Sequence, residues 1–391
     1  MSFCIASSIF AFQIKNQMKI GILGGGQLGR MFMQNALNYP FEVYFLEPDS
    51  SAPCAVFRDF FTQGDFKNYQ SVLDFGKDKE VIGIEIENVN VPALRELQKL
   101  GKKIIPSPDC LEIIKDKGLQ KQFYQKNNLP TAPFFLVENK AELLEIEDLS
   151  FPFVQKLRIG GYDGKGVQVI HNQEEMTNLW DAPSVIEKAI EIEKELSVIA
   201  SKNERGETQV FDVVEMVFNP KLNLVDYLFS PAEISSKNKR IAQEISIKTI
   251  ESFQTAGVFC VELFLSKNDE ILINEIAPRV HNSGHQTIEA SSSSQYDQML
   301  RVLTNLPLGE VRTRELSAMI NLIGEPDFEG IAHYEGIEKI VSLPETYIHL
   351  YGKKNTKAGR KMGHVTVLGK NKADIEEKIH FIKSNLKVKA K

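Results

Sequence analysis

The chain has 391 residues, of which 42% are hydrophobic and 25% are charged. This length predicts two to three domains with sizeable cores, and the charged fraction is typical of a globular protein. The net charge of -6 without a long basic run argues against a dedicated nucleic-acid binder, and no segment has the length of a membrane span. The four cysteines lack C-x-x-C spacing, which suggests neither a disulfide framework nor a thiolate zinc site and fits a cytoplasmic protein.

Residues 1–17 differ in character from the rest of the chain. They contain an apolar run from Phe3 to Phe12 but no basic n-region, so the pattern of a signal peptide is incomplete. Met18 directly precedes the first convincing strand. The simplest expectation is therefore that Met18 follows an upstream start codon or that residues 1–17 form a disordered extension.

Residues 18–115 alternate between strand and helix patterns. An apolar run at 19–23 is followed by a glycine turn, a helical pattern through Leu37 and a second strand at 42–46. Further strand patterns at 81–86 and 103–105 flank a helical pattern at 91–100. This order is typical of the α/β class and predicts an N-terminal domain with a doubly wound parallel sheet.

Residues 116–190 predict a small α+β lobe. A helical pattern over 110–127 ends at a break marked by two prolines, and strand patterns at 153–156 and 167–170 enclose the glycine-rich residues 160–166 as a hairpin with a mobile tip. Residues 185–188 add a strand to this lobe. Residues 191–391 predict a larger α+β domain with an antiparallel sheet, a helix over 294–304 and a C-terminal β-rich subdomain from about residue 320.

The glycine turn has the spacing Gly24-x-Gly26-x-x-Gly29, with Glu47 or Asp49 about 20 residues further on. This satisfies the fingerprint of a dinucleotide site, yet glycines at a helix N-terminus let backbone amides approach any phosphate. A tight turn that binds nothing is the alternative. Gln27 adds a side-chain amide within the turn.

A second glycine-rich segment, 160–166, follows Lys156 on the presumed strand. Flexible glycines with a nearby lysine suit a loop that covers a polyphosphate. A linker would be equally rich in glycine, but it would seldom be enclosed by β-branched strands.

Two glutamates lie on facing strand patterns, Glu262 at 261–265 and Glu275 at 271–276. If Ser266 faces Ile271 across a loop at 267–270, counting outward places Glu262 opposite Glu275. Opposite side chains on one sheet face lie about 5 Å apart, so the two carboxylates would repel each other unless a cation lay between them. The pair predicts a magnesium site of the kind that ATP enzymes use, and a solvent-exposed hairpin is the alternative.

Polar segments after the second glutamate extend the candidate site. His281 and His285 have the spacing of a zinc pair on a helix, but Pro278 and Gly284 disfavour a helix, so a polar loop beside the metal is the better interpretation. Residues 349–354 and 359–364 carry a cationic cluster on a plausible hairpin that can hold a substrate phosphate.

Together these segments resemble the ATP-grasp superfamily and, within it, the family of N5-carboxyaminoimidazole ribonucleotide synthetases. The resemblance runs from about residue 18 to residue 370, and its motifs are specific in this order rather than singly. The matching segments are 24–31, 85–87, 116–117 with 120–121, 161–166, 274–279 with 281–285, and 360–364.

The resemblance implies ATP-grasp architecture, with ATP and Mg2+ (or Mn2+) between a small lid lobe and the larger domain, and aminoimidazole ribonucleotide and bicarbonate as substrates of a cytoplasmic homodimer. It assigns the metal to Glu262 and Glu275, and catalysis to Arg279, Lys353 and Asp163. The implied ATP-binding residues are Lys117, Lys156, Gly161, Tyr162, Asp163, Gly164, Lys165, Gly166, Glu187, Lys188, Ala189, Ile190, Glu195, Asn274 and Glu275. The implied substrate-binding residues are Gln27, Leu28, Glu85, Tyr162, Asp163, Lys353 and Arg360.

The chain departs from the family pattern at two places. Ala277 stands where many ATP-grasp enzymes have an asparagine ligand, a loss that is itself typical of the purine carboxylases. Glu215 is followed by Met216, Val217 and Phe218, where the family tends to have an Asn and a His. This second departure puts one polar contact to the nucleotide or intermediate in doubt.

The expected reaction is attack of bicarbonate on the γ-phosphate of ATP, followed by carboxylation of the amine of aminoimidazole ribonucleotide. A formate-activating ligase of another purine ribonucleotide is an alternative within the superfamily. An NAD-dependent oxidoreductase would explain the first glycine turn but would leave the two glutamates without a role. A catalytically inactive binding protein is disfavoured because no candidate metal residue is missing.

Overall fold

The computed structural model describes residues 18–161, 166–219 and 224–391. The expectation for residues 1–17 and the site assignments of Tyr162, Asp163, Gly164 and Lys165 lie outside the described residues. In the part described, no helix is both long enough and apolar enough to cross a membrane.

The N-terminal domain contains a five-stranded parallel sheet in the order β3-β2-β1-β4-β5. This confirms the predicted doubly wound parallel sheet. Its two apolar strands nearest the centre are buried on both faces, which explains their continuous hydrophobic sequence. The elements are β1 (Lys19–Leu23), α1 (Gln27–Ala36), β2 (Glu42–Glu47), η1 (Pro53–Phe60), β3 (Phe61–Gln63), α2 (Tyr69–Gly76), β4 (Val81–Ile84), α3 (Val91–Lys99) and β5 (Lys103–Ile104).

The single helix expected over 110–127 is wrong. Two helices occupy this region, α4 (Pro108–Lys115) and α5 (Lys117–Lys126), and Asp116 between them has the extended backbone angles φ -119° and ψ 112°. The Asp116 carboxylate accepts hydrogen bonds from the amides of Gly118 and Leu119, so it caps α5. The sequence pattern predicted one continuous helix here. Asp116 interrupts it, because it ends α4 and caps the new helix α5.

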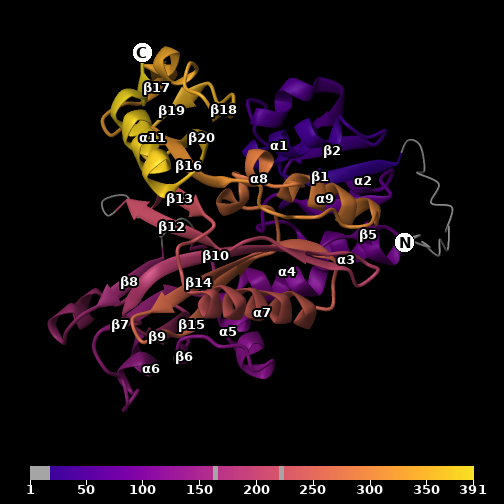
Figure 1. Ribbon diagram of the computed structural model, residues 1–391. Helices are drawn as coiled ribbons and strands as arrows, with labels where there is room; N and C mark the ends of the chain where they lie inside the picture. The colour runs from indigo at the N-terminus through magenta and orange to yellow at the C-terminus, as the bar shows by residue number, and fades with distance from the viewer. Residues whose placement is uncertain (1–17, 162–165, 220–223) are drawn as a thin grey trace, which may run out of the picture.

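The small lobe contains a four-stranded sheet in the order β6-β9-β7-β8. The predicted hairpin is confirmed by the antiparallel pairing of Lys156 with Val167, and the predicted strand at 185–188 lies beside it. Figure 1 shows this lobe at the lower left, with its helices on the outside. The elements are β6 (Phe134–Val137), α6 (Lys140–Leu144), β7 (Phe153–Leu157), β8 (Val167–Ile170), η2 (Glu174–Asn178) and β9 (Ser184–Lys188).

The remaining chain is organised by one nine-stranded sheet, in the order β15-β14-β10-β12-β13-β16-β20-β18 with β11 paired to β10. The sheet continues without a break from the β14–β15 hairpin, which carries Glu262 and Glu275, into the C-terminal part. Its strands are β10 (Ile192–Lys202), β11 (Thr208–Val210), β12 (Val214–Asn219), β13 (Leu224–Ser230), β14 (Gly257–Ser266), β15 (Ile271–Ala277), β16 (Leu316–Ile323), β18 (Thr346–Leu350) and β20 (Lys361–Gly369).

The C-terminal part also contains a three-stranded sheet in the order β19-β17-β21 and a 14-residue helix, α11, that packs on β20 and β16. Figure 1 shows this part, in yellow, beside the N-terminal domain. The remaining elements are α7 (Ser236–Ser252), η3 (Asn282–Gly284), α8 (Thr287–Ala290), α9 (Gln295–Thr304), β17 (Gly330–Glu335), α10 (Ile337–Ile340), β19 (Asn355–Thr356), α11 (Lys372–Asn385) and β21 (Lys387–Ala390).

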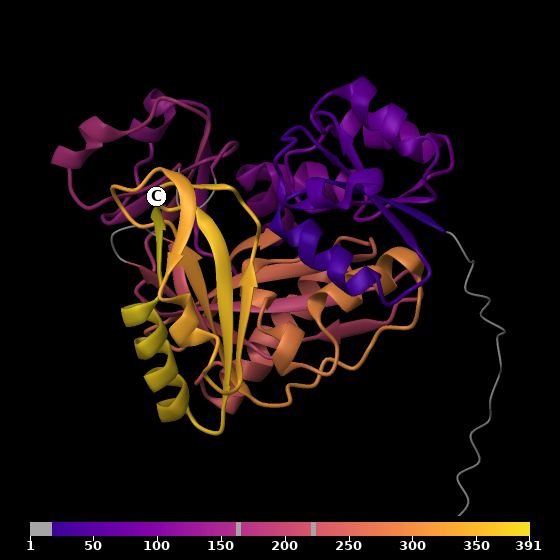
Figure 2. The same cartoon turned by 90° about the horizontal axis from the view of Figure 1, so that it is seen from above.

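One hydrophobic cluster joins the N-terminal domain to the large sheet. It contains Met31 and Phe32 of α1, Cys260 of β14, Leu300 of α9 and Tyr351 after β18. Seen from above in Figure 2, α1 and the orange α9 region lie against each other. The candidate site therefore lies at a hydrophobic junction of three parts of the chain.

Candidate active site

The hairpin of β14 and β15 places Glu262 directly opposite Glu275, which confirms the predicted pairing. The register predicted for the residues between the loop and these glutamates was wrong at two points. Leu265, rather than Ser266, faces Ile271, and a bulge at Asn274 then restores the register at the glutamates.

Both irregularities have a local cause. The amide of Asp269 donates to the carbonyl of Ser266 at 3.0 Å, and Asp269 has a φ of 63°, the left-handed conformation that ends a three-residue hairpin loop. The bulge then leaves Asn274 as the extra residue of β15. A bulge re-aims side chains next to functional sites, and here Asn274 contacts Lys156 of β7 while Glu275 contacts Lys117 of α5.

The two glutamates have different electrostatic environments. Burial, reinforced by Glu275 and Glu195, raises the pKa of Glu262 to about 8. Lys117 lowers the pKa of Glu275, because its ammonium forms an ion pair with Oε2 of that carboxylate. The site therefore already has one cation next to the pair, supplied by the first residue of α5.

A second group of charges lies where the small lobe meets β15. Lys156 on β7 contacts Oε2 of Glu187 at 3.0 Å and donates to Oδ1 of Asn274 at 2.8 Å. Lys121 contacts the other oxygen of Glu187 at 3.1 Å. Although burial raises the pKa of Glu187, Lys156 and Lys121 outweigh it and lower the pKa, so the carboxylate is held charged. Glu187 thus orients two lysines toward the same space.

The chain passes from the small lobe to the large sheet through Lys188, Ala189 and Ile190. The amide of Lys188 donates to the carbonyl of Pro133 at 3.0 Å, and the amide of Ala189 donates to that of Pro152 at 3.3 Å. Glu195 follows on β10, where burial raises its pKa to about 7 despite the charge of Lys156. This connection is therefore anchored to the small lobe just before it enters β10.

The first glycine turn is filled by side chains of its own domain. The amides of Gly26 and Gly29 both donate to the carboxylate of Glu85, and the amide of Gly25 donates to Glu47 at 2.9 Å. A Cβ on Gly24 would lie 2.4 Å from Cγ of Glu85, which explains the glycine. A dinucleotide phosphate would have to displace these carboxylates, so the turn presents a carboxyl group rather than an empty phosphate site.

Gln27 and Leu28 begin α1 directly after this turn. The Leu28 side chain is buried in the cluster that joins the domains, which leaves its backbone as the part able to contact a ligand. Burial raises the pKa of Glu85 to about 7, although the two amides lower it. Glu85 is therefore able to carry or release a proton near neutral pH.

Arg279 connects the glycine turn to the β14–β15 hairpin. Its guanidinium forms an ion pair with Glu87 at 2.7 Å, and its charge lowers the pKa of Glu85 and of Glu275. Its Nε is buried without a hydrogen-bond partner among the described residues. Glu87 was quoted from the sequence only as part of a motif, and its spacing of two residues from Glu85 was the available signal for this role.

The predicted basic hairpin is confirmed by the antiparallel pairing of β18 with β20. Lys353 donates to the carbonyl of Lys361 at 2.7 Å, and Arg360 donates to that of Asn355 at 2.8 Å. The Arg30 guanidinium of α1 lies against Gly352, so this hairpin meets the start of the glycine-turn helix. The charge of Lys361, which was not among the site residues selected from the sequence, opposes part of the rise in the pKa of Glu262 that burial causes.

The two histidines have separate environments, and the segment between them is a short 3-10 turn rather than an α-helix. Nε2 of His281 lies 3.5 Å from Oε1 of Glu262. His285 is buried and stacks on His364 at 4.6 Å between ring centroids. Of the polar loop predicted beside Glu262 and Glu275, His281 lies next to Glu262, whereas His285 belongs to the core.

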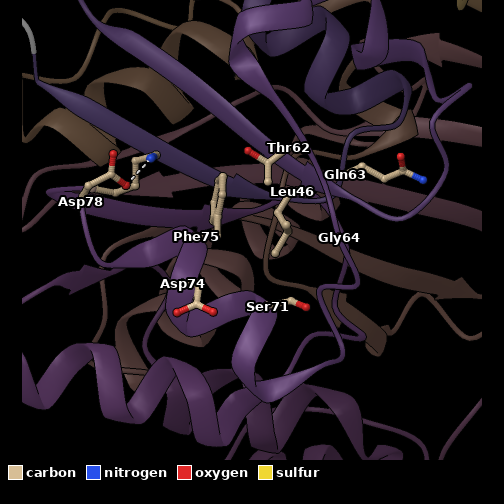
Figure 3. A pocket seen from close by; sticks show the side chains of 9 residues that line it. Leu46, Thr62, Gln63, Gly64, Ser71, Asp74, Phe75 and Asp78 are labelled. Carbon is tan, nitrogen blue, oxygen red and sulfur yellow. Dashed lines mark hydrogen bonds and ion pairs between the residues drawn. The ribbon is translucent and has the colours of Figure 1, made fainter.

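A pocket of about 490 Å³ lies elsewhere, between the β2 and β3 strands and α2 (Figure 3). Its carboxylates are already paired, Asp74 with Lys77 at 2.6 Å and Asp78 with Lys79 at 2.5 Å. It contains none of the residues selected from the sequence. The convergence of charges around Glu262, Glu275 and Arg279 is therefore the candidate active site.

The fold and this site define an ATP-grasp ligase. Residues 122–296 match the ATP-grasp domain, residues 17–115 match the ribonucleotide synthetase preATP-grasp domain, and residues 317–378 match the phosphoribosylaminoimidazole carboxylase C-terminal domain. The chain belongs to the N5-carboxyaminoimidazole ribonucleotide synthase family, as its similarity to curated and solved members shows.

Two curated relatives illustrate this similarity. The N5-carboxyaminoimidazole ribonucleotide synthase of Brucella melitensis is 34% identical over 90% of this chain and 97% of its own length. The phosphoribosylaminoimidazole carboxylase of Ogataea methanolica is 35% identical over 93% of this chain and 68% of its own length. The chain thus spans nearly all of the bacterial relative and about two thirds of the yeast one.

Two solved structures show the same likeness. The N5-carboxyaminoimidazole ribonucleotide synthetase of Thermotoga maritima superimposes with a TM-score of 0.89 at 38% identity, covering 96% of this chain and all of that one. The synthase of Aspergillus clavatus in complex with ADP and 5-aminoimidazole ribonucleotide gives 0.86 at 33% identity, covering 94% and 98%.

Proposed function

We propose that this protein uses ATP and bicarbonate to carboxylate 5-aminoimidazole ribonucleotide to N5-carboxyaminoimidazole ribonucleotide in purine biosynthesis. The observation that carries the proposal is the facing pair of Glu262 and Glu275, with lysines of the small lobe beside it, in a member of this synthase family. The relative solved with ADP and the aminoimidazole ribonucleotide supports the substrate class.

The donor set around the hairpin suits magnesium and ATP. Two carboxylates face each other, and burial together with the charges of Glu275 and Glu195 raises the pKa of Glu262. We assign a hard divalent cation to Glu262 and Glu275, where it would neutralise phosphate oxygens. Lys117 and Lys156 are assigned to the phosphates, and Asn274 holds Lys156 in position.

Further residues complete the proposed nucleotide site. We assign Glu187, Lys188, Ala189, Ile190 and Glu195 to the adenosine, because they connect the two lobes. Gly161 and Gly166, which begin and end the glycine-rich loop, lie close enough that a Cβ on Gly166 would be 3.2 Å from Cα of Gly161. The loop, with Tyr162, Asp163, Gly164 and Lys165, is proposed to cover the phosphates.

The second substrate is assigned to the space between the glycine turn and the basic hairpin. Gln27, the Leu28 backbone and Glu85 would contact the aminoimidazole ribonucleotide, with Tyr162 and Asp163 reaching it from the lid. Lys353 and Arg360 supply positive charge for its phosphate, since the hairpin meets the start of α1. Two parts of the chain more than 300 residues apart in the sequence numbering would thus share one ligand.

The residues then support the chemistry in order. Bicarbonate attacks the γ-phosphorus, ADP leaves, and carboxyphosphate forms while lysine charges neutralise the developing oxyanions. The ribonucleotide amine takes the carboxyl carbon, phosphate leaves, and a proton is lost from the amine. Arg279, held by Glu87, is placed to stabilise the carboxyphosphate, and we expect the enzyme to work as a homodimer of such sites.

The alternatives lose support at specific residues. An NAD-dependent oxidoreductase needs the amides of the glycine turn, and Glu85 and Glu47 occupy those amides. A formate-activating ligase would use the same ATP site. The decisive experiment measures ADP formation with bicarbonate or formate, with and without the aminoimidazole ribonucleotide. Stimulation that requires both bicarbonate and the nucleotide is expected, and stimulation by formate instead would contradict the proposal.

A further inference from the structure

Beside the magnesium glutamates lies a second set of donor atoms with a different chemical character. The Sγ of Cys260, a carboxylate oxygen of Glu262 and a ring nitrogen of His281 all lie within 4.8 Å of one another. We propose that Cys260, Glu262 and His281 form a binding site for a thiophilic divalent metal such as Zn2+, which takes Glu262 away from the magnesium pair.

The three side chains converge because of strand geometry. Cys260 and Glu262 are two residues apart on β14, so their side chains leave the same face of the sheet. His281 follows the end of the paired strand β15, and its Nε2 lies 3.5 Å from Oε1 of Glu262. Cysteine spacing alone did not indicate a metal site, because the ligands come from one cysteine and two other residue types.

The histidine ring is fixed in an orientation suitable for a ligand. Nδ1 of His281 accepts a hydrogen bond from the amide of Ser283 and lies 2.9 Å from the Oγ of the same residue. A metal-bound histidine commonly donates a hydrogen bond from the ring nitrogen that does not contact the metal, and Oγ of Ser283 is near enough to accept that bond once the proton moves from Nε2 to Nδ1. Nε2 is therefore directed at Glu262 rather than into the loop.

The cysteine is held close to the same group. Its Sγ lies 3.2 Å from Oγ of Ser197 and 3.5 Å from that of Ser283. Zinc bonds to sulfur at about 2.3 Å and to nitrogen or oxygen at about 2.0 to 2.2 Å, so the ligands need to approach one another by about 1 Å. A water molecule would complete four-coordination.

Access and selectivity both follow from the surroundings. Cys260 is fully buried, whereas the side chains of Glu262 and His281 each keep 17% exposure, so a metal would enter from the side of the active site. Thiolate and imidazole ligands favour zinc, and an oxygen-only set favours magnesium. On binding, the thiol loses its proton to solvent, and the proton of Nε2 moves to Nδ1 as the metal takes its place. Nδ1 then donates to Oγ of Ser283, and the Ser283 amide gives up its bond to Nδ1.

The functional consequence rests on the proposed magnesium role of Glu262. A metal bound by Cys260, Glu262 and His281 leaves Glu275 as the one carboxylate of the pair that can still hold magnesium. Thiophilic metals would therefore inhibit the ligase at concentrations too low to compete with magnesium for ATP. The binding itself is independent of that role. The two claims can therefore fail separately.

The test uses the full chain with Cys4→Ser as background, since Cys4 lies outside the described residues, and Co2+ as a spectroscopic probe. We expect one equivalent of Co2+ to produce a thiolate-to-cobalt charge-transfer band. Cys260→Ser keeps the size of the side chain beside its serine neighbours and is expected to abolish the band. Cys54→Ala and Cys110→Ala remove the other buried thiols and are expected to retain it.

Absence of the band in the background protein, or its survival in Cys260→Ser, would overturn the site. Saturating Mg2+ with ADP is expected to weaken Co2+ binding, because Glu262 is shared, and unchanged binding would overturn that sharing. In turnover assays, Cys260→Ser is expected to lower sensitivity to Zn2+ by at least about tenfold while activity with Mg2+ persists. Equal inhibition of both proteins would contradict the inhibitory role and leave the ligase assignment untouched.

Discussion

The carboxylates of Glu262 and Glu275 lie on one face of a hairpin, with the Lys117 ammonium against one of them. In this arrangement a lysine compensates part of the charge that a metal would otherwise neutralise. Burial and the neighbouring carboxylates raise the pKa of Glu262, whereas the lysine lowers that of Glu275. The two glutamates are therefore not equivalent. Substitution of Glu275 tests the metal assignment, and substitution of Glu262 tests the pH dependence.

Replacing Glu275 by Gln removes the carboxylate that is already ionised and leaves its shape. We expect kcat to fall by at least about two orders of magnitude, as when one electrostatic group at a transition state is lost. Circular dichroism and thermal melting are expected to show a folded protein. The control is Glu270→Gln in the loop of the same hairpin, where Glu270 is exposed and activity should persist. Near-normal turnover of Glu275→Gln would refute the metal assignment.

The raised pKa of Glu262 gives a pH dependence with a definite sign. A carboxyl whose folded pKa lies near 8, above its ordinary value, stabilises the protein at low pH, and that contribution is lost as pH rises through about 8. Magnesium needs the deprotonated form, so its binding should strengthen with pH up to about 8. We expect Mg2+ with ADP to raise the melting temperature more at about pH 8.5 than at about pH 6.5.

The comparison variant for this pH effect is Glu262→Gln, which has no proton to lose at that position. Its melting temperature should show a much smaller difference between the two pH values when Mg2+ is added. A difference as large as in the parent protein would mean that another group is responsible, for example Glu195, whose pKa is raised to about 7.

At the scale of elements, the break between α4 and α5 determines where Lys117 lies. Asp116 caps α5 and also binds Arg158 of the small lobe, with the guanidinium at 2.7 and 3.0 Å from its two oxygens. The same carboxylate therefore starts the helix, places Lys117 at its first position and ties it to the small lobe. The glycine turn is a comparable case, in which Glu85 satisfies the amides at the start of α1.

Asp116→Ala removes both the cap and the ion pair. We expect a loss of about 1 to 2 kcal/mol in the free energy of unfolding from the cap. We also expect lower kcat, because Lys117 is no longer oriented. Asp116→Asn is the matched variant, since asparagine caps helices as well as aspartate but cannot pair with Arg158. Chemical denaturation and steady-state kinetics measure both effects, and equal behaviour of the Ala and Asn variants would show that capping is irrelevant.

At the scale of the molecule, the small lobe is attached to a much larger body. Its core contains six buried residues among those described, whereas the cluster between α7 and the large sheet contains eighteen. The nine-stranded sheet, by contrast, runs unbroken from the β14–β15 hairpin to the C-terminal part. Local opening free energy follows the amount of buried apolar contact, so the small lobe should open more readily than the body.

Hydrogen exchange tests this difference directly. Amides of β7 and β9 should exchange faster than those of β10 and β14, and Mg2+ with ADP should slow exchange in β7 and β9, where Lys156 and Glu187 lie. Peptides from β2 serve as the internal control, since that strand is remote from the proposed nucleotide site, and should be unaffected. Uniform protection across all three regions would contradict a separately opening lobe.

Much of the architecture followed from sequence patterns because those patterns are local. Alternation of strand and helix predicted the parallel sheet, and apolar runs predicted the two hairpins and the helix at α9. Two long helices, α7 and α11, were not predicted from the sequence. The helix predicted at 110–127 is two helices, because capping by Asp116 requires a change of backbone direction that hydrophobic periodicity does not record.

The sequence by itself determined which residues are candidates for the chemistry, because the two glutamates on adjacent strands, the glycine turns and the basic hairpin are short-range patterns. Only the tertiary structure decided how they meet. The bulge at Asn274 sets which glutamates face each other, Glu85 fills the amides of the first glycine turn, and Cys260 meets His281. These three features depend on an irregularity of the backbone or on contacts between distant segments. Local periodicity encodes neither the irregularity nor the contacts.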